Sequence, residues 1–205
     1  MRTNRFAKLL IPLMLAMAPV AAFGHGSADP ATKPAVAPFN ESESADILQE
    51  IKAFANARIS ARRAVAIAER RGAGAKVVDL SFDGSSSRLA YRVKVLLNEE
   101  LWEGTIDAST GAAVGDGSTT PASQLDEEGK TALAAFSAAG IDLSATISIA
   151  ERYGSGKAVS AGLQHDGAKL KLLVVVVSDG ALKEVSIEPG ERRSRQRRAS
   201  AREKK

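Results

Sequence analysis

The chain contains an internal repeat, and this repeat limits the folds that the sequence can adopt. When the sequence is shifted by 82 positions, residues 67–70 coincide with residues 149–152, because both segments read Ile-Ala-Glu-Arg. Five further pairs match at the same offset: Phe54 with Phe136, Ala57 with Ala139, Ile59 with Ile141, Gly72 with Gly154, and Gly74 with Gly156. A constant offset over 21 positions indicates that one structural unit occurs twice.

Both copies of the unit read as a helix followed by strands. Ser60 and Asp142 occupy matching positions, and both residue types cap helix N-termini well. Each cap precedes about eleven residues with apolar positions at helical spacing. Gly72 and Gly154 then stand where a left-handed residue would end each helix. Upstream, apolar residues around 47–55 and 133–136 predict one more amphipathic helix per copy.

Alternating apolar and polar residues after each helix predict antiparallel strands. The alternation is clearest over residues 88–97, and Asp179-Gly180 is typical of a two-residue hairpin. The sequence therefore predicts an α+β fold of two tandem copies of a small module. Each copy has one or two helices packed on a three-stranded antiparallel sheet. A unit of this size is marginally stable alone, so we expect the two copies to pack on each other.

The ends of the chain differ from this folded part, and the whole divides into six segments. The expected order is a signal peptide 1–24, a flexible spacer 25–43, a first repeat 44–117, a linker 118–125, a second repeat 126–190 and a disordered basic tail 191–205. Arg2, Arg5 and Lys8 precede a short apolar stretch typical of a signal peptide, with cleavage after Ala18, Ala22 or Gly24. An uncleaved anchor is the alternative, although the stretch is short for a span.

The absence of cysteine limits the kinds of chemistry that the protein can perform and the ways in which it can be anchored. Disulfides, thiol catalysis and thiolate metal sites are all excluded by the composition. The usual bacterial lipid anchor also requires a cysteine at the cleavage point. Together with the leader, this predicts a periplasmic or secreted protein.

The net charge of +4 is unevenly distributed along the chain. The leader carries +3 and the tail +6, so residues 9–190 carry −5. Five arginines in the tail are candidate contacts for anionic lipid, lipopolysaccharide or nucleic acid: Arg192, Arg193, Arg195, Arg197 and Arg198. No aromatic residue is interleaved, so a specific nucleic-acid site is not expected. The alternative is a solvated tail that tethers or solubilises the protein.

Several motifs of the first copy resemble the PepSY domain family. They are the helix that ends in Ile-Ala-Glu-Arg, the spaced glycines, the segment Tyr91-Arg92-Val93 and the closing residues 106–111. The resemblance covers most of 58–117 and, more weakly, 143–190, where Leu172-Leu173-Val174 replaces the tyrosine segment. It implies a non-catalytic binding module that restrains or regulates a peptidase in the cell envelope, and it supplies no catalytic residues.

The residues themselves do not indicate an enzyme, a cofactor or a metal site. His25 and His165 are the two histidines, and no metal-binding or phosphate-binding motif surrounds them. Glu69 and Glu151 recur in the repeat, and we interpret them as structural contacts or solvated ion pairs. Asp107 is expected to cap a turn. Cleavage after Ala22 would leave an amino-terminal Phe-Gly-His, which suits Cu(II), with an ordinary spacer histidine as the alternative.

The second copy presents apolar residues on both faces of its long strand. Leu173, Val175 and Val177 lie opposite the expected core side, so they form a candidate partner face. The first copy, a second chain in a homodimer, or a separate protein partner would each bury them. Two functions follow as alternatives: an exported PepSY-type binding module, or an envelope-associated protein tethered to an anionic surface by its arginine-rich tail.

Overall fold

A computed structural model describes residues 41–85, 88–166 and 169–188. In this part of the chain, the helices and strands follow one another in a fixed order: α2 Glu41–Phe54, α3 Ala61–Ala68, β1 Lys76–Asp83, β2 Ala90–Leu97, β3 Glu100–Asp107, β4 Ala113–Pro121, α4 Glu127–Ala139, α5 Leu143–Gly154, β5 Lys157–Asp166, β6 Lys169–Ser178 and β7 Ala181–Ile187. Short 3₁₀ helices occupy Glu69–Arg71 and Ala122–Gln124. This mixture of helices with antiparallel strands confirms the predicted α+β class.

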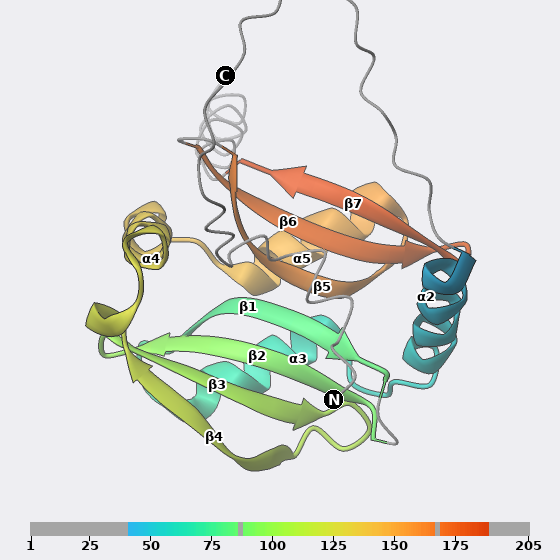
Figure 1. The fold of residues 1–205 in the computed structure, drawn as a ribbon, viewed down its shortest axis with the longest axis horizontal. Coiled ribbons are helices and arrows are strands. Elements are labelled where there is room, and N and C mark those ends of the chain that lie inside the picture. Colours follow the sequence, from blue (N-terminus) through green and yellow to red (C-terminus); the bar gives the residue numbers. More distant parts are fainter. Residues whose placement is uncertain (1–40, 86–87, 167–168, 189–205) are drawn as a thin grey trace, which may run out of the picture.

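The strands form one continuous antiparallel sheet in the order β4-β3-β2-β1-β5-β6-β7. Helices α3 and α5 lie side by side on one face of it, whereas α2 and α4 lie near opposite ends of the strands (Figure 1). The two halves therefore meet edge to edge through β1 and β5. Separate three-stranded sheets were expected, but the halves share one sheet.

A fourth strand in the first half was missed by the sequence interpretation. β4 extends through residues expected to be a linker, and Gly115 and Gly117 adopt left-handed φ angles of 71° and 73° within it. These residues bulge away from β3, where the register shifts between Glu103 and Thr105. The bulge closes over Trp102, whose indole Nε1 donates a hydrogen bond to the Asp116 carbonyl at 2.9 Å. A glycine-rich strand lacks the alternation that marks strands in a sequence.

The same local structure follows α3 and α5. β1 bulges between Val77 and Asp79, and β5 bulges between Ala158 and Ser160, 81 positions later. The offset falls from 82 to 81 because the connection before β5 is one residue shorter. Leu80 pairs with Ala161 across the junction, so equivalent residues lie opposite each other. The halves are thus arranged about an approximate twofold axis at this pair.

The N-caps of α3 and α5 are as predicted, but the ends of these helices are not. Ser60 Oγ accepts from Arg63 N, and Asp142 Oδ1 accepts from Ala145 N at 3.0 Å. Gly72 has an extended φ of −179°, so the predicted left-handed conformation is wrong there. Gly154 is the last residue of α5, and Ser155 adopts the left-handed φ of 51°.

Both glycines instead lie close to a strand side chain, and the approach is tighter at Gly154. A Cβ on Gly154 would overlap Val176 Cγ2, and one on Gly72 would lie 2.9 Å from Leu97 Cδ2. Close approach of a helix end to a strand gives the same sequence signature as a left-handed cap. The sequence alone could not separate the two causes.

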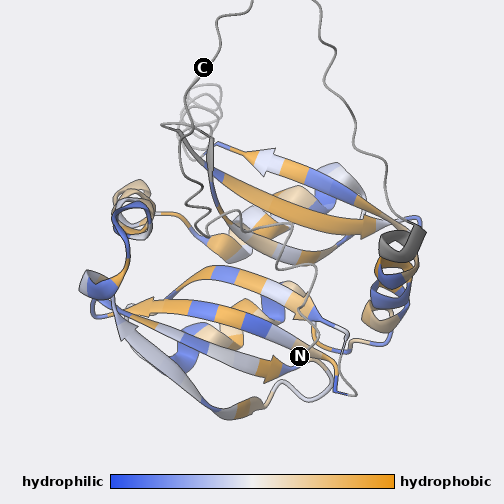
Figure 2. Cartoon of the chain, viewed as in Figure 1, coloured by the Kyte–Doolittle hydropathy of each residue, from blue (hydrophilic) through white to orange (hydrophobic). Residues whose placement is uncertain are grey.

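The core fills the space between the sheet and the two central helices. Its largest fully buried side chains come from both halves: Tyr91, Phe82, Phe136, Leu80, Ile106, Leu143, Ile147 and Leu172. Hydrophilic and hydrophobic residues alternate along β1 to β3, whereas β6 is hydrophobic along most of its length (Figure 2). One half therefore has a polar outer sheet face that the other half lacks.

Within the described ranges, no single helix is long and apolar enough to cross a membrane. α4 and α5 reach the required length and apolarity only as a pair, and they meet at a bend of 85°. The predicted leader, most of the spacer and the basic tail lie outside the described residues.

Candidate interaction surfaces

The recurring glutamates stabilise the two strand bulges. Glu69 Oε1 accepts a hydrogen bond from Val77 N at 3.4 Å, and Glu151 Oε1 accepts one from Ala158 N at 3.1 Å. Each bond ties the end of a helix to the strand that follows it, at a bulge where a backbone N–H needs an acceptor. The interpretation of these glutamates as structural contacts is confirmed.

Asp107 caps a turn, also as predicted. Its Oδ1 accepts from Ser109 N at 2.9 Å and from Thr110 N at 2.8 Å. These backbone hydrogen bonds, the first from Thr110, lower the pKa of the Asp107 carboxyl because they favour its charged form. The cluster of Asp107, Ser109 and Thr110 is therefore a turn and not a catalytic group.

The outer face of β1 to β3 is covered by cross-strand ion pairs. Lys94 Nζ lies 3.2 Å from Glu103 Oε1, Arg92 Nη2 lies 2.6 Å from Asp83 Oδ2, and Arg88 Nε lies 3.5 Å from Asp107 Oδ2. Five of these six residues, all except Asp107, line a shallow groove of about 680 Å³. Because these charged groups already pair with one another across the strands, they have little need of a ligand.

Asp79 is the acid of this groove that is least well stabilised. Its carboxylate leans over Gly162 of β5, where a Cβ would lie 2.5 Å from Oδ2. Burial raises the pKa of Asp79 to about 6, although the nearby Lys94 ammonium partly opposes the shift. The Coulombic effect of Glu103 adds to the rise. Asp79 therefore changes its charge close to neutral pH.

The candidate partner face of β6 is mostly covered in the folded chain. Leu173 is 5 % exposed, Val175 is fully buried and Val177 is half-buried. The other side of the strand faces α5, since Gly154 of that helix lies against Val176. In this conformation Leu173 and Val175 offer almost no area to a separate partner.

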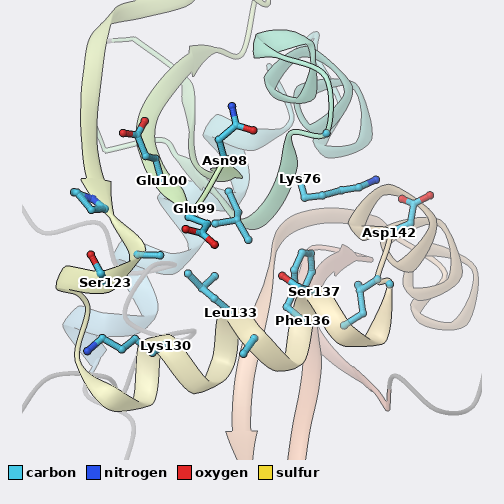
Figure 3. Close-up of a pocket in the computed structure, with 17 residues that line it drawn as sticks. Lys76, Asn98, Glu99, Glu100, Ser123, Lys130, Leu133, Phe136, Ser137 and Asp142 are labelled. Atoms are coloured by element: carbon cyan, nitrogen blue, oxygen red, sulfur yellow. The ribbon is translucent and has the colours of Figure 1, made fainter.

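A cleft of about 980 Å³ opens where α4 meets the β2–β3 hairpin (Figure 3). Leu133 and Phe136 of α4 project from the helix toward the hairpin, and both are buried. Leu96 and Ile141 add further apolar lining. The 3₁₀ helix beside the cleft is held to the hairpin by Ala122 N, which donates to the Glu99 carbonyl at 2.7 Å.

Charged groups surround this apolar floor. Glu99 and Glu100 lie at the hairpin, and Lys76 extends toward Asp142 (Figure 3). Asp142 is engaged as the N-cap of α5, and Lys130 pairs with Glu127 at 2.8 Å. An apolar floor with a few polar groups at its rim is the usual composition of a ligand-binding cleft.

The hairpin at the rim of the cleft contains two residues in an unfavourable backbone conformation. Asn98 and Glu99 both adopt left-handed conformations, with φ angles of 51° and 62°. A two-residue turn of this kind requires positive φ at both positions, and asparagine followed by glycine suits it best. Glutamate at the second position carries a conformational cost that glycine would avoid.

None of the residues around the cleft was predicted as a site. The Asn-Glu pair between two alternating segments was the available signal, but it lacks the glycine that marks such turns. Contact between α4 and a hairpin some thirty residues earlier depends on the long-range arrangement of the sheet, which no local pattern reveals.

The remaining candidates cannot be placed. His25 and the tail residues Arg192, Arg193, Arg195, Arg197 and Arg198 lie outside the described residues. Within the described ranges, no group of three or more His, Asp or Glu side chains could hold a metal ion.

Comparisons with known proteins give a family match for part of the first half. No curated protein matches the chain. A crystal structure of a protein from Clostridium difficile 630, described as a candidate lipoprotein, is similar with a TM-score of 0.38 and 17% identity. That similarity covers 65% of this chain and 88% of the other. Residues 58–116, the segment from before α3 to within β4, match the family model of PepSY, the peptidase propeptide and YPEB domain.

Proposed function

We propose that this chain is an exported, non-catalytic binding protein that restrains or regulates a peptidase in the cell envelope. The observation that carries the proposal is the PepSY match over residues 58–116, a family described by its occurrence in peptidase propeptides. The leader-like N-terminus supports export to the periplasm or the medium.

The roles of the recurring acids support binding rather than catalysis. Glu69 and Glu151 accept hydrogen bonds from backbone amides at the bulges, and Asp107 is occupied by its turn. The acidic residues that recur or cluster in the sequence therefore have structural roles. Such roles are expected if the chain is a binding module without catalytic groups.

The second half is, in this proposal, a divergent copy of the PepSY domain. It has the same N-cap position, the same bulge and the same glutamate contact as the first half. It lacks the buried tyrosine: Tyr91 donates from its hydroxyl to the Ile59 carbonyl at 2.8 Å, whereas Leu172 stands at the equivalent position. The copies have diverged most in their strands.

The cleft beside the β2–β3 hairpin is the proposed contact for the peptidase. The hairpin belongs to the PepSY domain, and the cleft combines an apolar floor with Glu99 and Glu100 at its rim. Within the described ranges neither glutamate forms an ion pair, so both are available to a partner.

Site-specific photo-crosslinking in the native bacterium tests the proposal. A photoreactive phenylalanine analogue would replace Ala134, an exposed residue of the cleft, or Arg62, an exposed residue on α3, as the matched control. We expect a peptidase to crosslink from position 134 and not from position 62. Failure to recover a peptidase from position 134, with the variant exported and folded, would contradict the proposal.

A second candidate function is attachment to an anionic surface through the tail. The charge of +6 in residues 191–205 is the observation that favours it. Deletion of residues 192–205 should abolish binding to anionic vesicles at low salt and leave the melting temperature unchanged. Vesicle binding by the deletion variant at the parent level would exclude the tether.

A further inference from the structure

The two edges of the seven-stranded sheet differ in their capacity to pair with another strand. β4 carries a bulge with two left-handed glycines and ends at Pro121. β7 pairs with β6 in unbroken register from Ala181 to Ile187 and contains neither glycine nor proline. Bulges and prolines protect an edge against further pairing, whereas a regular edge is a template for an added strand. In the described part of the chain, no strand pairs with the outer side of β7.

An exposed aromatic residue lies on α5, the helix that packs on β5, β6 and β7. Tyr153 of α5 is 64 % exposed, one of two large hydrophobic side chains so exposed among the described residues. Glu151 lies on the flank of α5 that faces β5, because it accepts from Ala158 N. Tyr153 is two residues further along, about 200° around the helix, so it occupies the opposite flank, toward β7.

Within the sheet, the two halves are already joined by antiparallel pairing of their edge strands. β1 and β5 join the two halves in this way, and α3 and α5 pack together above the junction. An extended segment added to β7 would continue the same arrangement, with Tyr153 covering its side chains on the helix face.

The charges of β7 favour a foreign strand over a second copy. An antiparallel pair of β7 strands centred on residue 183 or 184 would place Lys183 opposite Lys183 or Glu184 opposite Glu184. Like charges directly opposite each other are destabilising. A partner strand with a basic residue opposite Glu184 and an acidic residue opposite Lys183 would be stabilised instead.

We propose that the outer edge of β7 binds an extended segment of a partner protein as an eighth, antiparallel strand. The partner strand carries apolar residues opposite Val185 and Ile187, a basic residue opposite Glu184 and an acidic residue opposite Lys183. Backbone hydrogen bonds provide the affinity, and the charge order provides the direction and register. The inference rests on the proposed function for the nature of the partner, a protein chain, but not for its identity as a peptidase.

Two fluorescein-labelled peptides test this surface. The first, Val-Thr-Val-Lys-Glu-Val, complements β7 from Ile187 to Leu182 in antiparallel order. The second exchanges its Lys and Glu and so places like charges opposite each other. In anisotropy titrations of the full chain, we expect the first peptide to bind at least about tenfold more tightly than the second.

Protein variants provide the matched controls. Glu184→Lys changes an exposed side chain, so it should fold like the parent and shift the preference toward the second peptide. Tyr153→Ala should weaken binding of the first peptide about tenfold. Hydrogen exchange with the first peptide bound should slow at amides of β7 and remain unchanged in β4.

Three results would overturn the inference. They are equal binding of both peptides, a preference that Glu184→Lys does not alter, and slowed exchange at β4 instead of β7. A chain that sediments as a dimer, with its β7 amides protected before any peptide is added, would assign the edge to a second copy. Peptidase restraint is measured separately, so peptide binding at β7 without restraint would refute only the proposed function. Restraint without peptide binding at β7 would refute only this inference.

Discussion

At the scale of single residues, the fold disfavours ionisation of the Asp79 carboxyl. Because burial raises its pKa from 3.8 to about 6, the folded protein binds this proton more tightly than the unfolded protein does. The free energy of unfolding therefore decreases as the pH rises from about 4 to about 6, and the penalty persists at higher pH.

Asp79→Asn should remove this penalty. We expect the variant to be more stable than the parent by about 1–2 kcal/mol at pH 8, because the amide carries no charge that burial would penalise. The difference should shrink toward pH 4, where the parent is protonated as well. Urea unfolding at a series of pH values measures it, and a constant difference across that range would show that Asp79 is not the titrating group.

Glu99 is a second residue whose replacement should stabilise the protein. Glu99→Gly relieves a left-handed conformation and restores the preferred Asn-Gly turn, so we expect a gain of about 0.5–1 kcal/mol in the free energy of unfolding. Asn98→Gly is the control and should gain less, because asparagine tolerates this conformation. A loss of stability in Glu99→Gly would indicate that the glutamate side chain has a structural role.

At the scale of elements, local sequence patterns predicted the helix caps and the hairpin turn. They did not predict features that depend on contacts between residues distant in sequence. Ser60, Asp142 and the Asp179-Gly180 turn were predicted because each depends on neighbouring residues alone. The packing role of Gly154 was not predicted, because it depends on contact with Val176, which is distant in sequence. The β4 strand and the cleft share this dependence on long-range pairing.

Substitution of the two helix-end glycines distinguishes close packing from backbone conformation. Gly154→Ala should cost about 1–3 kcal/mol, since its Cβ would overlap the stiff, fully buried Val176. Gly72→Ala should cost clearly less, because it meets only the end of the flexible Leu97 side chain and its backbone is extended. Thermal unfolding of the two variants gives the comparison, and equal costs would contradict the packing explanation.

At the scale of the whole molecule, two similar halves form one sheet with different outer faces. The first half has paired charges on its outer face, and the second half buries Leu173 and Val175 at the equivalent place. The repeat predicted that the halves would pack together, but not that they would share a sheet. Edge-to-edge joining leaves the β2–β3 hairpin beside α4 to form the cleft, and leaves β7 as the regular outer edge.

The central proposal is that the chain is exported and restrains a peptidase, and the direct measurement is inhibition of the crosslinked peptidase. The purified chain would be titrated into that enzyme while casein hydrolysis is followed, with Ala134→Trp, which fills the cleft, as the matched variant. We predict that hydrolysis falls to a plateau at one chain per peptidase and that Ala134→Trp requires at least about tenfold more protein. Unchanged hydrolysis at a saturating concentration of the folded parent chain would contradict the account.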